Sequence, residues 1–125
     1  MNLFGVGIDI VDFDRIKIIY LKYGEKFAKK ILNVNELNSF FLSKHKVPFL
    51  AKRFAAKEAI GKAMGVGIVN GFLLKNIILE HDNFGKPIAR LIKKKELELY
   101  LDKIIHISIS DDKNFAVANA IILNK

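Results

Sequence analysis

Residues 53–65 read RFAAKEAIGKAMG and form most of a long helical pattern that opens at Pro48 and runs to Met64. Alanines recur at every fourth position of this pattern, so they lie along one side of the helix and give it almost no side-chain volume there. A helix with such a ridge can lie very close to a β-sheet. The alanines of the ridge are Ala51, Ala55, Ala59 and Ala63.

The same helix carries few charges, and their spacing allows two interpretations. Phe54, Glu58 and Lys62 are four residues apart, so they share a stripe beside the alanine ridge that drifts by only about 40° per step. The simplest interpretation is an ion pair between Glu58 and Lys62 on a solvated helix face. The alternative is that Glu58 is held near a packed surface because it takes part in chemistry.

The N-terminal segment predicts a strand. Residues 3–10, LFGVGIDI, alternate strictly, with bulky apolar side chains on one face and two glycines and Asp9 on the other. This pattern is typical of a strand with one buried face. The apolar positions are Phe4, Val6, Ile8 and Ile10.

Helical and strand patterns follow in turn along the chain. Asp12 is a candidate N-cap for a helix that Gly24 ends, and Asn33 with Glu36 predicts a capping box for a later helix. The second half shows, in order, strand 72–81, turn 82–87, strand 87–92, short amphipathic helix 93–103, strand 104–110, turn 111–114 and strand 115–123. We therefore expect an α+β fold, with one domain over residues 1–125 and an antiparallel sheet packed against the long helix.

Composition narrows the classes of function. The 125 residues include no cysteine, which excludes disulfides, thiolate metal sites and a cysteine nucleophile. The longest uncharged stretches are shorter than the ~18 residues of a membrane span and the N-terminus lacks a secretory pattern, so we expect a cytoplasmic protein. A formal net charge of +8 indicates an anionic partner: nucleic acid, a phosphorylated ligand or an acidic protein. No metal-ligand spacing relates the histidines, which are expected to be structural or solvated: His45, His81 and His106.

Two carboxylates suggest a metal site. Asp9 ends an apolar strand, and its simplest interpretation is a strand-end or helix-capping carboxylate shared with Asp12. If Asp9 and Glu58 met over a cleft, they would suit Mg²⁺, which proteins commonly hold with one or two carboxylates and substrate phosphates. The turn at 82–87, with Lys86, and the glycines after the helix would fit a phosphate-bearing ligand, and both are also ordinary loop features.

Four segments together resemble a known family. They are GVGIDIVDFDRI over 5–16, RFAAKEAIGKAMG over 53–65, NFGKP over 83–87 and HISIS over 106–110. In this order they are similar to the holo-[acyl-carrier-protein] synthase family, the small bacterial class of 4'-phosphopantetheinyl transferases. The resemblance implies the fold of that superfamily and a homotrimer with shared active sites. It also implies transfer of the 4'-phosphopantetheine arm of coenzyme A to a serine of apo-acyl carrier protein in fatty acid biosynthesis, with adenosine 3',5'-bisphosphate as the leaving product.

Carried over by position, the resemblance gives roles to individual residues. Asp9 and Glu58 would bind Mg²⁺, and Lys62 would pair with phosphate oxygens or help to protonate the leaving group, which makes these three the catalytic set. The coenzyme-binding set would be Lys62, Gly65, Gly67, Asn83, Gly85, Lys86, Pro87 and Ser110. The resemblance leaves open whether Glu58 or a metal-bound water takes the serine proton, and whether the metal is Mg²⁺ or Mn²⁺.

The resemblance also gives the positive charge a partner, because acyl carrier proteins are strongly acidic. The residues implied in carrier binding are Arg15, Lys22, Lys26, Lys29 and Arg53. One position departs from the family pattern: the residue after the second serine of HISIS is Asp111, where family members usually have a histidine, and its carboxylate would repel a phosphate.

Two other functions stay open at this point. One is a basic nucleic-acid-binding module without catalysis, in which the carboxylates would be structural. The other is a degenerate homologue that binds coenzyme A or the carrier without turnover. Under the transferase interpretation, neither nucleic acid nor a membrane is a partner.

Overall fold

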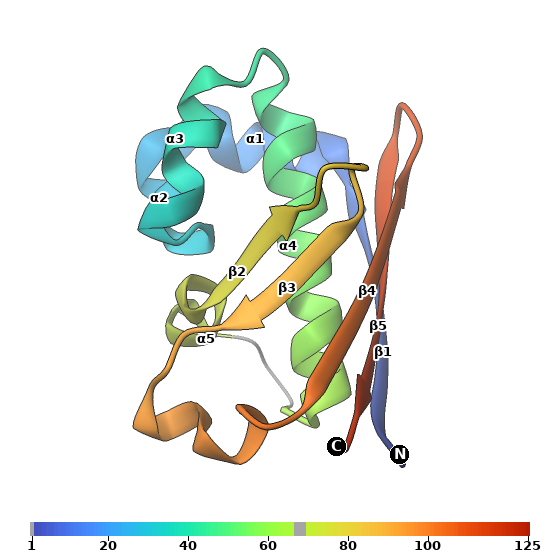
Figure 1. Ribbon diagram of the computed structural model, residues 1–125. Helices are drawn as coiled ribbons and strands as arrows, with labels where there is room; N and C mark the ends of the chain where they lie inside the picture. Colours follow the sequence, from blue (N-terminus) through green and yellow to red (C-terminus); the bar gives the residue numbers. More distant parts are fainter. Residues whose placement is uncertain (1, 67–69) are drawn as a thin grey trace.

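A computed structural model describes residues 2–66 and 70–125 (Figure 1). The first half holds strand β1 (Leu3–Asp12) and helices α1 (Phe13–Tyr23), α2 (Glu25–Ile31), α3 (Val34–Leu42) and α4 (Lys46–Met64). The second half holds helix α5 (Gly71–Asn76), strands β2 (Ile77–His81) and β3 (Pro87–Leu91), the 3-10 helix η1 (Lys95–Tyr100), and strands β4 (Ile104–Asp111) and β5 (Phe115–Leu123). The expected α+β class is confirmed.

The strands form two antiparallel sheets, one with the order β1-β5-β4 and one that pairs β2 with β3. Helix α4 runs along the three-stranded sheet, and α1, α2 and α3 gather at one end of α4, on the side away from this sheet (Figure 1). The two chain ends meet, because the backbone N–H of Asn124 donates to the carbonyl of Asn2 at 2.8 Å. Within the described ranges, no helix is both long and apolar enough to cross a membrane.

The alanine ridge of α4 packs directly on the glycine face of β1, and each of its four alanines is at most 3% exposed. A methyl group built on Gly7 would lie 2.0 Å from the carbonyl oxygen of Ala59. One built on Gly5 would lie 1.8 Å from the carbonyl oxygen of Ala63. Only glycine on β1 permits the backbone of α4 to lie this close, so the glycine face of the strand and the alanine ridge of the helix are complementary in shape.

The apolar face of β1 points away from α4. Val6 is 56% exposed, and Ile8 and Ile10 are each 61% exposed. The strand therefore has one buried face, as expected, and within a single chain that face is the one that carries the glycines. Glycines take the buried side because the backbone of α4 lies too close for any larger residue.

The segment expected as one strand over 72–81 divides into helix α5 and strand β2. The side chain of Asn70 accepts a hydrogen bond from the backbone N–H of Leu73 at 3.0 Å and so caps α5. A short apolar run is compatible with either a buried strand or a buried helical turn. Here the Asn70 cap favours the helical turn. The short helix expected over 93–103 is the six-residue η1, which buries Leu97.

A buried ion cluster joins α4 to neighbouring helices. Glu36 forms the predicted capping box of α3 and is 2% exposed. The buried ammonium group of Lys57 donates to one oxygen of this carboxylate, and Arg53 Nε donates to the other at 3.2 Å. The remaining donors of Lys57 reach the carbonyls of Ile31 and Leu74 at 2.8 and 2.9 Å. Lys57 is therefore structural, which leaves Glu58 and Lys62 for other roles.

Candidate active site

Asp9 lies on the glycine face of β1 and therefore points toward α4. Lys62 Nζ donates to Asp9 Oδ1 at 3.0 Å and to the carbonyl oxygen of Ile8 at 2.9 Å. The Asp9 side chain is 17% exposed and that of Lys62 is 50% exposed. The lysine thus crosses from helix to strand, and its ion pair is with Asp9 rather than along its own helix.

Glu58 belongs to the same cluster. Burial raises its pKa above the ordinary range for glutamate, and the negative charge of Asp9 raises it further. The positive charges of Lys62 and of Arg15, on α1, act in the opposite direction. This coupling means that the two carboxylates lie within electrostatic reach of each other, as the metal-site interpretation requires.

The donor set fits a hard divalent cation. Two carboxylates that repel each other across an interface would both be stabilised by a shared positive ion. Among the described residues there is no cluster of three or more His, Cys, Asp or Glu side chains that could hold a metal. Asp9 and Glu58 would thus be the protein ligands, and substrate phosphates or water would complete the shell, a pattern common for Mg²⁺.

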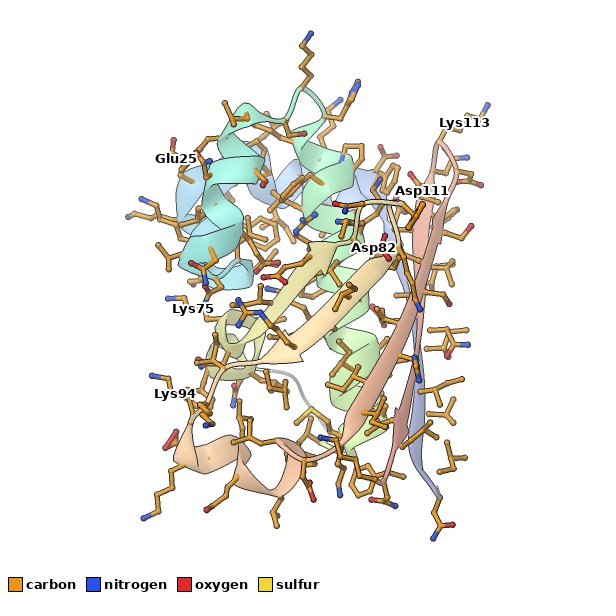
Figure 2. The ribbon with its side chains drawn as sticks, viewed as in Figure 1. Glu25, Lys75, Asp82, Lys94, Asp111 and Lys113 are labelled. Carbon is orange, nitrogen blue, oxygen red and sulfur yellow. The ribbon has the colours of Figure 1, made fainter. Side chains whose placement is uncertain are left out.

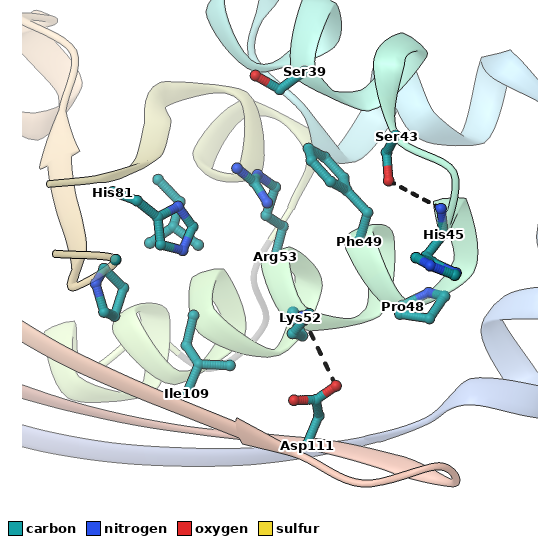
Figure 3. A pocket seen from close by; sticks show the side chains of 13 residues that line it. Ser39, Ser43, His45, Pro48, Phe49, Lys52, Arg53, His81, Ile109 and Asp111 are labelled. Atoms are coloured by element: carbon teal, nitrogen blue, oxygen red, sulfur yellow. Dashed lines mark hydrogen bonds and ion pairs between the residues drawn. The ribbon is translucent and has the colours of Figure 1, made fainter. Parts of the chain in front are cut away.

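A cavity of about 520 Å³ opens between the end of α3, helix α4, the β2–β3 turn and the end of β4 (Figure 3). Gly85 and Pro87 of the expected coenzyme-binding turn line it, together with Asp111. Figure 2 shows Asp82 of the turn and Asp111 at the same end of the molecule. Lys52 Nζ lies 3.8 Å from the carboxylate of Asp111, so this carboxylate has a cationic partner inside the cavity. The cationic and imidazole side chains that line the cavity are Lys52, Arg53, His45 and His81.

The β2–β3 turn, which was expected to fit a phosphate-bearing ligand, engages backbone amides of its own. The N–H groups of Phe84 and Lys86 both donate to Asp82 Oδ1, at 2.8 and 2.9 Å. These amides are therefore already used within the turn. Gly85 adopts a positive φ of 81°, which explains the glycine. The Asn83 and Lys86 side chains are exposed.

The remaining residues that were expected to bind coenzyme A are spread over the molecule. Gly65 ends α4 in the left-handed conformation, with φ 85°. Gly67 lies outside the described residues. Ser110 sits in a shallow hollow with Ile10 and Phe115, on the exposed face of the three-stranded sheet. The structure therefore places Ser110 away from α4 and on the face that a neighbouring chain could cover.

Four of the five residues implied in carrier binding are exposed on two consecutive helices. Arg15 and Lys22 lie on α1, and Lys26 and Lys29 lie on α2. Arg53 differs, because it is 8% exposed, is held by Glu36 and lines the cavity. Its position suits a wall of the cavity better than an exposed docking surface.

Sequence reasoning missed the cavity-lining roles of Lys52, His45 and His81. His45 and Lys52 are seven residues apart at the start of α4, but no spacing in the chain relates either of them to His81, at the end of β2. Only the packing of the β2–β3 turn against α4 and β4 brings them together.

Comparison with known proteins identifies the family of this chain. A family model described as the 4'-phosphopantetheinyl transferase superfamily matches residues 5–120. The chain therefore belongs to that superfamily.

Individual relatives show to which family within the superfamily the chain belongs. The holo-[acyl-carrier-protein] synthase of Buchnera aphidicola subsp. Acyrthosiphon pisum (strain Tuc7) is 44% identical and covers 99% of this chain and 100% of its own length. A crystal structure of that enzyme from Neisseria meningitidis has a TM-score of 0.89 and 37% identity, with 98% and 99% of the two chains covered. A Bacillus anthracis synthase solved in complex with CoA (3',5'-ADP) has a TM-score of 0.82 and 35% identity, with both chains covered completely. Within the superfamily, the chain belongs to the holo-[acyl-carrier-protein] synthases, which are phosphopantetheinyl transferases.

Proposed function

We propose that this protein transfers the 4'-phosphopantetheine group of coenzyme A to a serine hydroxyl of an apo-acyl carrier protein. The convergence of Asp9, Glu58 and Lys62 from β1 and α4 is the observation that carries the proposal. The serine oxygen attacks the phosphorus that bears pantetheine, a new O–P bond forms, and the bridging P–O bond to the nucleotide breaks. Adenosine 3',5'-bisphosphate leaves, and the serine proton passes to Glu58 or to water. The reaction would serve fatty acid biosynthesis, as the family resemblance implies, and would take place in the cytoplasm, as the sequence pattern predicts.

The cluster can supply the charge that this transfer needs. Asp9 and Glu58 would hold a Mg²⁺ ion, which would neutralise the diphosphate of the coenzyme. Lys62 is half-exposed, so its ammonium group can turn from Asp9 to a phosphate oxygen and stabilise charge on the leaving group. Phosphoryl-type transfer depends mainly on such neutralisation and on placement of the attacking oxygen, so no covalent enzyme intermediate is required.

The cavity is the proposed site for the nucleotide part of coenzyme A. Its lining includes Lys52 and Arg53, whose positive charges suit phosphate groups, and Gly85 and Pro87 of the turn. The solved relative named with CoA (3',5'-ADP) supports a nucleotide site in this fold. Asp111 is paired with Lys52, so its carboxylate does not by itself argue against a bound phosphate.

The exposed basic residues of α1 and α2 are the proposed carrier-docking surface. Their charge complements an acidic carrier and should accelerate association more than it strengthens the final complex. Salt should therefore slow the reaction at low carrier concentration.

We also propose that the protein is a homotrimer whose subunits meet at the exposed face of the three-stranded sheet. Val6 pairs across strands with Ile121, and Ile10 with Val117, so apolar side chains of β1 and β5 lie side by side on this face, with Asn119 opposite Ile8 as a polar member. Contiguous exposed apolar surface of this kind marks an interface. A neighbouring copy of the chain covering this face would also reach the hollow that holds Ser110.

Intact-mass spectrometry tests the transfer. Incubation of apo-carrier with coenzyme A, Mg²⁺ and the enzyme should add the mass of one phosphopantetheine group to the carrier. Asp9→Asn and Glu58→Gln should each abolish the gain, and Glu98→Gln, which changes an exposed carboxylate on η1, should not. A competent carrier that gains no mass rejects the proposal, and a gain that survives both carboxylate changes rejects the metal role.

A further inference from the structure

We propose that His81 is a proton-linked ligand of the nucleotide: its imidazole takes up a proton as an anionic phosphate enters the cavity, so that binding tightens as the pH falls. This rests on the proposed function, which supplies adenosine 3',5'-bisphosphate as a product and therefore as a probe.

The position of His81 makes such a contact available. It is the last residue of β2, its side chain is exposed, and it lines the cavity together with Lys52 and Arg53 of α4 (Figure 3). Arg53 is fixed in place, because Glu36 binds its guanidinium group and Phe49 stacks on it at 3.8 Å. An anion that enters the cavity would meet two cations on one wall and the imidazole on another.

Partial burial and the neighbouring charges favour the neutral form of His81 while the cavity holds no anion. Its pKa lies below the ordinary histidine value, first because of partial burial and then because of the positive charges of Arg53 and Lys52, while Asp82 acts in the opposite direction. The other titratable groups that face the cavity are His45, from the start of α4, and Asp111, from the end of β4. A histidine whose pKa is lowered partly by two neighbouring cations takes up a proton more readily when a ligand cancels their charge.

A bound phosphate reverses this balance. Its negative charge favours the imidazolium form and raises the pKa of His81, and the charged ring then donates a charge-assisted hydrogen bond to the phosphate. Because a proton is taken up on binding, the affinity for the nucleotide rises as the pH falls. The rise occurs between the higher pKa of His81 in the complex and its lower pKa in the free protein. The phosphate itself loses its second negative charge near pH ~6, so the window of interest lies above that value.

Isothermal titration calorimetry with adenosine 3',5'-bisphosphate, at fixed Mg²⁺ and in buffers of different ionisation enthalpy, measures the uptake directly. Wild-type protein should take up a fraction of a proton per ligand near neutral pH. His81→Gln should lose this uptake and bind about tenfold more weakly at pH ~6.5, with less than a twofold difference at pH ~8.5, because a charge-assisted bond is lost only where the imidazole would be charged. His45→Gln removes the other imidazole of the cavity and is the matched control; it should keep the wild-type uptake.

Each result decides the proposal. Unchanged uptake in His81→Gln, or its loss in His45→Gln, overturns it. Nuclear magnetic resonance titration of the wild-type imidazole signals, assigned with the same variants, gives a second readout that does not depend on how well a variant folds. The pKa of His81 should rise when the nucleotide binds, and a constant pKa overturns the proposal. If wild-type protein binds neither adenosine 3',5'-bisphosphate nor coenzyme A, the proposed function fails and this inference fails with it; binding without proton uptake removes this inference alone.

Discussion

At the scale of single residues, Glu58 is a carboxylate whose negative charge is disfavoured by the fold. Because its pKa is raised, the folded chain holds the proton more tightly than the unfolded chain does. The stability of the folded state therefore falls as the pH rises through the ionisation of this group, and the cost is complete once the pH lies above its raised pKa. A charge that destabilises the fold is what a metal-binding carboxylate is expected to show.

This leads to a prediction for Glu58→Gln in a buffer without divalent cations. The variant should melt about 3 °C above wild type at pH 7, since removal of a functional carboxylate relieves its repulsion with Asp9. Near pH 4 the difference should shrink, because the wild-type group is then largely protonated. Turnover should fall by at least ~100-fold. Differential scanning calorimetry and the mass assay measure both effects, and a variant that melts below wild type at pH 7 would contradict the account.

Magnesium provides the companion measurement. A cation that binds the folded state alone raises the melting temperature by mass action, so Mg²⁺ should stabilise wild type. The same addition should have no effect on Asp9→Asn or Glu58→Gln. An equal stabilisation of all three proteins would place the ion elsewhere on the chain.

Glu36 carries a second prediction at this scale. It is the shared partner of Lys57 and Arg53 in a buried cluster, so Glu36→Gln leaves two buried cations without a countercharge. We expect a loss of about 3–5 kcal/mol of unfolding free energy, the range for breaking a buried pair from one side. Urea denaturation measures it, and Glu25→Gln, which breaks the exposed pair with Lys29, serves as the control with little change. A Glu36 variant as stable as this control would show that the cluster contributes little.

At the scale of elements, the sequence predicted those features that local chemistry determines. The capping box at Glu36, the stop at Gly24 and the alanine ridge of α4 each follow from a few neighbouring residues, and all are present. The buried face of β1 could not be inferred in this way. Alternation predicts two faces, but which face is covered depends on α4, whose backbone lies against the glycines. Helix α5 was missed because its apolar residues suit either a strand or a helical turn.

The contact between β1 and α4 gives the prediction that belongs to this scale. Gly7→Ala places a methyl group 2.0 Å from the carbonyl oxygen of Ala59, so the strand and helix must separate. We expect a loss of about 3 kcal/mol, at the upper end of typical overpacking, and a further loss of activity because Asp9 and Glu58 sit on the two surfaces that move apart. Gly71→Ala, with nothing within 4 Å of the new methyl group, should be neutral or stabilising by up to ~1 kcal/mol. Chemical denaturation of both variants decides the matter, and equal stabilities would mean that the close packing is not required.

At the scale of the whole molecule, part of the candidate site could be found from the sequence and part could not. Asp9, Glu58 and Lys62 stand in two compact motifs, so their types and order were enough to suggest a shared role. The cavity is assembled from the start of α4, the β2–β3 turn and the end of β4, which are distant along the chain. Neither Lys52 nor His81 lies in a motif of its own, and their meeting depends on tertiary packing alone.

The exposed apolar face of the three-stranded sheet gives the last prediction. Changing Ile8 and Ile10 together to lysine places two charges in the middle of a patch whose native side chains are each 61% exposed in the single chain. The fold should be retained, because these side chains are not packed in the core. Assembly should be prevented, because burying the two ammonium groups in the interface would require their desolvation. Size-exclusion chromatography with light scattering should find a trimer for wild type and single chains for the double variant. Activity should fall together with trimer formation, because the proposed sites are shared between subunits.

Leu99→Lys changes a residue on η1 that is 78% exposed and should leave the trimer intact. Wild-type protein that runs as a single chain with full activity would show that each chain carries a complete site, and the apolar face would then need another partner.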